Sequence, residues 1–216
     1  MKQILITGIP RSGTSIVAEI ISLCGIQGGQ VNSMFENTYL QGYFRNVLSE
    51  KGYDINGHHP LPPIDFTSLE IRKQMEMTWA YQGVSGDWYY KDCRILLFCN
   101  QFITEYPEAE YILIRRTEKN IIESCKKTGY MNVFDDFTLR TRLGIYNTEQ
   151  GWKYMIGEYN KRMEYLKNKV KVTEIWLEDN VNAKHTIPYM MERTGITINK
   201  DIYNNIYSLI DKKIKI

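Results

Sequence analysis

The sequence contains no apolar run long enough to span a bilayer or to form the core of a signal peptide. It also lacks a strong excess of one charge: 27 Lys and Arg stand against 25 Asp and Glu, so the formal net charge is only +2. This balance argues against the broad basic field of a surface that binds nucleic acid or a membrane, and we expect neither partner. Any anion site must therefore be local and formed by a few placed side chains.

Cysteine is scarce, and none of the four cysteines forms a CxxC pair. They are Cys24, Cys93, Cys99 and Cys125. Reduced thiols in a cytoplasmic protein are the simplest interpretation, with disulfides as the alternative.

The composition is that of a globular protein, with 43% hydrophobic and 24% charged residues. A chain of 216 residues favours one domain over residues 1–216. Strands are expected over 2–7, 87–90, 111–115 and 170–176, and helices over 13–24, 39–50, 67–81, 94–105, 117–127, 151–167, 183–193 and 200–211. Because strands alternate with helices, we predict an α/β fold with a mostly parallel central sheet and helices on both faces. The loops after Thr7, Tyr90, Arg115 and Trp176 should then meet at the carboxyl edge of this sheet.

The first strand–helix junction reads GIPRSGTS over residues 8–15. It has the length and the closing glycine of the Walker A pattern, and its backbone N–H groups should face an anion at a helix N-terminus. Thr14 stands where the Walker pattern needs lysine, while Arg11 supplies a cation earlier in the loop. The alternative is an ordinary strand–turn–helix junction. The candidate phosphate-binding residues are Pro10, Arg11, Ser12, Gly13, Thr14 and Ser15.

A second anion-binding pair is predicted at the end of the third strand. Arg116 follows the apolar segment 111–114, and Ser124 lies eight residues later on the expected helix. Eight residues make just over two helical turns, so the two side chains can converge, and a guanidinium is a planar fork for phosphate. The alternative is a solvated basic strand end followed by an ordinary helix serine.

Together these two segments resemble the donor site of the PAPS-dependent sulfotransferases, most closely the bacterial and tyrosylprotein members. PRSGT at 10–14 is similar to their 5′-phosphosulfate loop, and Arg116 with Ser124 is similar to their 3′-phosphate pair. The resemblance extends from residue 2 to about residue 196 and includes the segment 174–179, which we interpret as structural support. The family's C-terminal basic loop has no counterpart, and Lys126 and Lys127 are the candidates to replace it.

The resemblance implies a three-layer P-loop-like fold and sulfuryl transfer from PAPS as co-substrate, without a metal. Arg11 would stabilise the leaving group, and Lys91, at the end of the second strand, would be a second catalytic cation. The related enzymes have a glutamate base about twenty residues past the loop arginine, where this chain has Asn32. Glu36 is therefore the favoured base, with His58 and His59 as alternatives.

The acceptor class stays open between carbohydrate, small alcohol, amine, lipid and peptide. The segment Gly42–Phe44 resembles a stretch of some bacterial members in which an acid follows, but Arg45 stands in that position here. This difference is expected to alter the acceptor pocket.

Two other functions fit the same fold. A P-loop kinase or NTPase would need the Walker lysine and an acidic strand end, for which Thr14 and Arg116 are the wrong residues. A noncatalytic nucleotide-binding domain is favoured by Asn32 in the position of the base.

Overall fold

A parallel β-sheet forms the centre of the computed structural model, which describes residues 1–58, 61–66, 68–129 and 132–213. Its strands are β1 (Gln3–Gly8), β2 (Trp88–Lys91), β3 (Glu110–Arg115) and β4 (Val172–Trp176). They pair in the order β2-β1-β3-β4, all in parallel, with Ile6 opposite Lys91 and Ile112. The predicted α/β class with a parallel sheet is confirmed.

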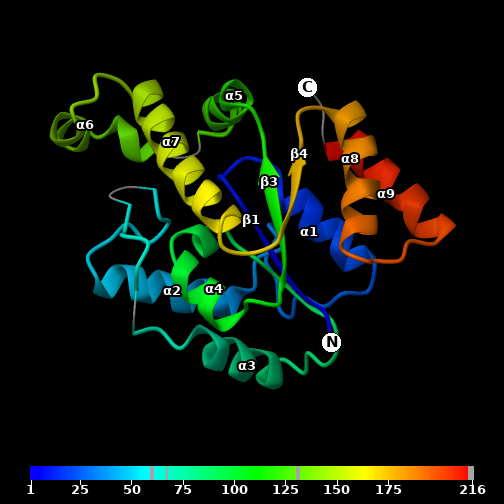
Figure 1. Cartoon of the computed structure of the whole chain (residues 1–216). Helices are drawn as coiled ribbons and strands as arrows, with labels where there is room; N and C mark the ends of the chain where they lie inside the picture. The colour runs from blue at the N-terminus through cyan, green and yellow to red at the C-terminus, as the bar shows by residue number, and fades with distance from the viewer. Residues whose placement is uncertain (59–60, 67, 130–131, 214–216) are drawn as a thin grey trace.

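Helices cover both faces of this sheet (Figure 1). The α-helices are α1 (Thr14–Leu23), α2 (Thr38–Glu50), α3 (Ile71–Tyr81), α4 (Cys99–Glu105), α5 (Glu118–Thr128), α6 (Phe137–Leu143), α7 (Thr148–Lys167), α8 (Asn180–Arg193) and α9 (Lys200–Lys213), and the 3₁₀ helices are η1 (Cys93–Leu96) and η2 (Asn132–Asp135). One core cluster joins α1, α8 and α9 to the sheet, and the other joins α2, α3, α4, α5 and α7 to its opposite face. In the described parts of the chain, no helix has the length and apolar character to cross a membrane.

The central strands are apolar on both faces, as a sheet covered on two sides requires. Ile4 and Ile6 of β1 enter the core with α1 and α8, while Leu5 between them enters the opposite core. Burial of one such side chain stabilises the fold by roughly 1.5–3 kcal/mol. Polar side chains consequently gather beyond the strand ends, where the loops to the helices begin.

Two predicted helices differ from the observed ones, and in each case a carboxylate outside the predicted range accepts from backbone N–H groups where an observed helix begins. The expected helix over 94–105 is divided into η1 and α4, and the side chain of Asp92 accepts from Arg94 N at the start of η1. The expected helix over 67–81 begins at Ile71, where the Glu105 carboxylate accepts from the backbone N–H of Ile71 and Arg72. Helix α6 was not predicted, and none of its side chains is fully buried.

Candidate active site

The loop between β1 and α1 is curled by unusual backbone angles. Arg11 has φ 73° and Gly13 has φ 104°, both in the left-handed region. A Cβ on Gly8 would lie 2.5 Å from the carbonyl oxygen of Ile114, so only glycine allows β1 to end against β3 here. A non-glycine residue held at positive φ is a local cost that proteins tend to concentrate at functional sites.

The N-terminus of α1 is left without a side-chain cap. Gly13 occupies the N-cap position and has no side chain that could accept a hydrogen bond from the first turn. Free N–H groups and the positive end of the helix dipole make such a terminus attractive to an anion. Ser12 Oγ, in a fully buried residue, also has no hydrogen-bond partner among the described residues.

The two arginines that end β3 have different surroundings. Arg115 forms ion pairs with Glu164 and Glu174, and it donates to Asn160 Oδ1 over 3.1 Å. Arg116 instead turns toward the first loop, where its Nη1 donates to the Arg11 carbonyl over 3.4 Å. Its Nε is buried without a partner in the described chain, and burial lowers the pKa of Arg116, with Arg11 adding to the effect. Arg116 is therefore the cation that is placed to receive a ligand.

A cleft of about 620 Å³ joins the loop, Arg116 and Ser124. Arg11 Nε donates to Ser124 Oγ over 3.1 Å, which ties the loop to α5. The predicted site residues that line this cleft are Pro10, Arg11, Ser12, Gly13, Thr14, Ser15, Glu36, Lys91, Arg116 and Ser124. The two segments that the sequence singled out thus form one site at the carboxyl edge of the sheet.

Further cations border the same cleft. Lys127 lines it, whereas Lys126 faces away and pairs with Glu149 over 2.6 Å. Lys213, from α9, also lines the cleft and forms an ion pair with Glu19. The sequence offered no signal for Lys213, because only the packing of α9 against α1 brings it here. Glu178, from the segment interpreted as structural support, accepts from Thr117 N over 2.7 Å.

Glu36 and Lys91 form a largely buried ion pair at the other end of the cleft. Lys91 Nζ donates to Glu36 Oε1 over 2.7 Å, and the two side chains are 5% and 14% exposed. Lys91 ends β2, while Glu36 precedes α2. A carboxylate and an ammonium thus lie together in the cleft that the β1–α1 loop also lines.

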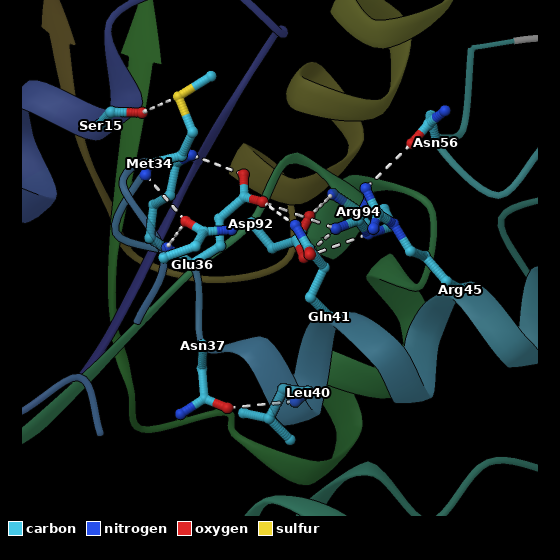
Figure 2. Close-up of polar contacts among 12 residues, drawn as sticks. Ser15, Met34, Glu36, Asn37, Leu40, Gln41, Arg45, Asn56, Asp92 and Arg94 are labelled. Carbon is cyan, nitrogen blue, oxygen red and sulfur yellow. Dashed lines mark hydrogen bonds and ion pairs between the residues drawn. The ribbon is translucent and has the colours of Figure 1, made fainter. Parts of the chain in front are cut away.

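A buried polar network continues from this pair, and no sequence motif indicated it. Gln41 donates to Glu36 Oε2, and Arg94 Nη2 lies 3.9 Å from the same oxygen (Figure 2). Arg94 is held by Asp92, whose Oδ2 lies 2.9 Å from Nη2 and also accepts from the hydroxyl of Tyr90 over 2.9 Å. Glu36 is therefore oriented from both sides, by Lys91 and by the Gln41–Arg94 side of the network.

Asn32 supports the turn that presents Glu36. Its side-chain oxygen accepts from the backbone N–H of Met34 over 2.8 Å and of Glu36 over 3.1 Å. Its own N–H donates to the Glu36 carbonyl over 3.0 Å. The residue in the expected position of the base thus fixes the carboxylate four residues later.

The alternative bases are placed differently. His58 is buried, does not line the cleft, and its Nδ1 lies 3.8 Å from Asp54 Oδ2. Burial lowers the pKa of His58, the Asp54 carboxylate opposes the shift and Arg94 adds to it. His59 lies outside the described residues.

Comparison with known proteins adds three findings. A family model described as a sulfotransferase domain matches residues 3–194. A comparison with curated protein sequences gives no match. Among solved structures, the chain is similar to a sulfotransferase from Alicyclobacillus acidocaldarius, with 12% identity, 99% of this chain and 96% of that chain covered, and a TM-score of 0.53. It is also similar to sulfotransferase STF1 from Mycobacterium tuberculosis H37Rv, with 12% identity, coverage of 96% and 70%, and a TM-score of 0.49.

Proposed function

Because the chain belongs to the sulfotransferase domain family, we propose that it transfers a sulfuryl group from PAPS to an acceptor hydroxyl or amine and releases adenosine 3′,5′-bisphosphate. The observation on which this proposal rests is the meeting of Arg11, Arg116 and Ser124 in one cleft. A nucleotide with phosphates at its 3′ and 5′ positions needs two anion sites within the reach of one ligand.

Unsatisfied polar atoms of the cleft fit a phosphorylated ligand. The hydroxyl of Ser12 and the Nε of Arg116 are buried without a partner in the described chain, and such atoms are costly unless a ligand completes them. The uncapped N-terminus of α1 would take the 5′-phosphosulfate end. Arg116 and Ser124 would bind the 3′-phosphate, and Lys127 and Lys213 would add to the positive electrostatic potential of the cleft.

Sulfuryl transfer is a displacement at sulfur. A bond forms between the acceptor oxygen or nitrogen and sulfur, the bond from sulfur to the 5′-phosphate oxygen breaks, and the acceptor proton must be removed. Glu36 would accept this proton. Arg11 and Lys91 would stabilise the charge that develops on the leaving phosphate. An ammonium has three N–H groups, so Lys91 can donate to Glu36 and still donate to bound PAPS.

We further propose that residues 1–216 form one domain of this kind. The family match ends at residue 194, but Ile206 and Ile210 of α9 are buried in the same core cluster as α1 and α8. No disulfide joins the four cysteines in the described parts of the chain, and thiols of this kind are typical of a reducing compartment such as the cytoplasm.

Binding of adenosine 3′,5′-bisphosphate tests the donor assignment without knowledge of the acceptor. In calorimetry, Arg116→Ala should weaken binding by about 1.5–3 kcal/mol, the scale of a hydrogen bond to a charged group. Arg142→Ala is the matched control, because Arg142 is exposed on α6. ATP with Mg²⁺ should bind less tightly than the bisphosphate without metal.

The outcomes separate the candidate functions. Unchanged affinity in Arg116→Ala removes Arg116 from the site. Preference for ATP with Mg²⁺ favours a kinase or NTPase. Tight binding of the bisphosphate, with no turnover of PAPS across a panel of acceptors followed by mass spectrometry, favours a noncatalytic domain.

A further inference from the structure

Arg45 is a half-buried cation without a carboxylate partner in the described chain. Its one hydrogen bond runs from Nη2 to Asn56 Oδ1 over 3.2 Å, and its Nε is buried without a partner. Asn56 is neutral, so it leaves the charge of the guanidinium uncompensated. Burial of a charge is costly unless an opposite charge accompanies it, which makes Arg45 a candidate for binding an anion.

The cations in and around this network outnumber the carboxylates that pair with them. Arg94 lies 2.9 Å from Asp92 Oδ2 and 3.9 Å from Glu36, and Lys91 is paired with Glu36. Among the described residues, these two cations and Arg45 thus have only two carboxylates, Asp92 and Glu36, within ion-pair distance. In Figure 2, the side chains of Gln41 and Arg45 leave α2 and point toward Arg94. An anionic group placed here would balance the excess charge.

The position of Arg45 relates it to the acceptor rather than to the donor. Gln41 and Arg45 are four residues apart on α2, so they lie on one face of the helix. Gln41 donates to Glu36, and Glu36 lines the donor cleft, whereas Arg45 does not. The face of α2 therefore leads from the proposed base away from the phosphate loop to the Arg45 guanidinium, whose hydrogen-bond partner is the neutral Asn56.

We propose that Arg45 binds an anionic group of the acceptor, so that the acceptor is a carboxylate-bearing alcohol or phenol rather than a neutral one. The inference rests on the proposed function, because it takes Glu36 as the base that receives the hydroxyl proton. A guanidinium presents paired N–H donors that match the two oxygens of a carboxylate. Arg45 would hold this carboxylate while the hydroxyl of the same molecule faces Glu36.

A purely structural role is the alternative, since Arg45 also anchors the loop that carries Asn56. Three variants separate the two roles. Arg45→Gln removes the charge, Arg45→Lys keeps it, and Asn56→Ala removes the loop contact while leaving Arg45 intact. Arg142→Gln, at an exposed position on α6, is the control for the change in net charge.

The test measures binding of matched ligand pairs to the protein loaded with adenosine 3′,5′-bisphosphate. The pairs are methyl glucuronide with methyl glucoside, and 4-hydroxyphenylacetate with 4-hydroxyphenylacetamide. The wild type should bind a carboxylate member about tenfold more tightly than its neutral partner, and Arg45→Gln should abolish this preference. Arg45→Lys, Asn56→Ala and Arg142→Gln should keep most of it.

Four results overturn the proposal. They are equal binding of both members in the wild type, no measurable binding of any carboxylate, an unchanged preference in Arg45→Gln, and loss of the preference in Asn56→Ala as well. Failure of the donor assignment is seen separately, as absent binding of adenosine 3′,5′-bisphosphate in the first titration. The preference for a carboxylate can also be measured without nucleotide. A failure of the Arg45 proposal can therefore be distinguished from a failure of the nucleotide assignment.

Discussion

The Lys91–Glu36 pair allows the proposed chemistry to be tested by a double-mutant cycle. The variants are Lys91→Met, Glu36→Gln and the two combined. The ammonium and the carboxylate lie 2.7 Å apart with side chains 5% and 14% exposed. Removal of either partner leaves the other with its charge only partly balanced, while removal of both leaves no unpaired charge from this pair.

The expected magnitude follows from the surroundings of the pair. Breaking a buried ion pair by removing one partner costs about 3–5 kcal/mol. Here Glu36 keeps Gln41 and the more distant Arg94, and both members of the pair border an open cleft. We therefore expect Lys91→Met to lower the free energy of unfolding by about 2–3 kcal/mol, below the full range. Because the partners are in contact, the loss of unfolding free energy in the double variant should be about 1–2 kcal/mol smaller than the sum of the losses in the two single variants.

Urea unfolding measures the free energies, and turnover of PAPS measures the chemistry. Glu36→Gln should lower sulfuryl transfer by roughly 10²–10⁴-fold, the scale of a general base, while it leaves the affinity for adenosine 3′,5′-bisphosphate nearly unchanged. If the losses of unfolding free energy in the two single variants add up to the loss in the double variant, Lys91 and Glu36 do not interact in solution. Full transfer by Glu36→Gln would instead exclude Glu36 and move the base to His58, His59 or another residue.

Two further predictions concern residues around the site. Asn32→Ala removes the oxygen that accepts from Met34 N and Glu36 N, so it should lower stability by about 1–2 kcal/mol in urea unfolding and reduce turnover; unaltered turnover would show that Glu36 does not need this turn. Burial holds the pKa of His58 in the folded protein below its ordinary value of about 6.5. Between these two pKa values the unfolded chain binds more protons than the folded protein does. The free energy of unfolding should therefore fall as the pH drops through this window. The wild-type Tm should therefore fall more than that of His58→Gln between pH 7.5 and 5, and parallel curves would contradict this.

That Arg11, Arg116 and Ser124 would meet in one cleft could be predicted because the signals are local in sequence. The curled loop needs Gly8 and Gly13, and both are visible as glycines between an apolar strand and a helix. Arg116 and Ser124 are eight residues apart on one strand–helix unit, so their convergence depends on little beyond the helix repeat. The parallel pairing of β1 with β3 then brings the two units together, as an alternating strand and helix pattern predicts.

The remaining features depend on contacts that sequence spacing does not encode. Glu105 sets the start of α3 from more than thirty residues away, and Asp92 with Arg94 divides a segment whose pattern favoured one helix. Lys126 and Lys127 are adjacent in sequence, yet only Lys127 lines the donor cleft, because the two side chains leave α5 in different directions. The start of α3 in particular is set by a tertiary interaction that overrides a local preference.

The arrangement of the site also explains why acceptor chemistry is harder to infer than donor chemistry. The donor groups come from two strand–helix units, whereas Glu36, Arg45 and Arg94 come from a turn, a helix and a 3₁₀ helix. Strand β2 pairs with β1, η1 follows β2 directly, and Arg94 of η1 lies 3.9 Å from Glu36, just before α2. A substitution at Arg45 can therefore change the charge offered to an acceptor without touching the loop or Arg116. Acceptor preference should accordingly depend on α2 and η1, while the nucleotide site stays the same.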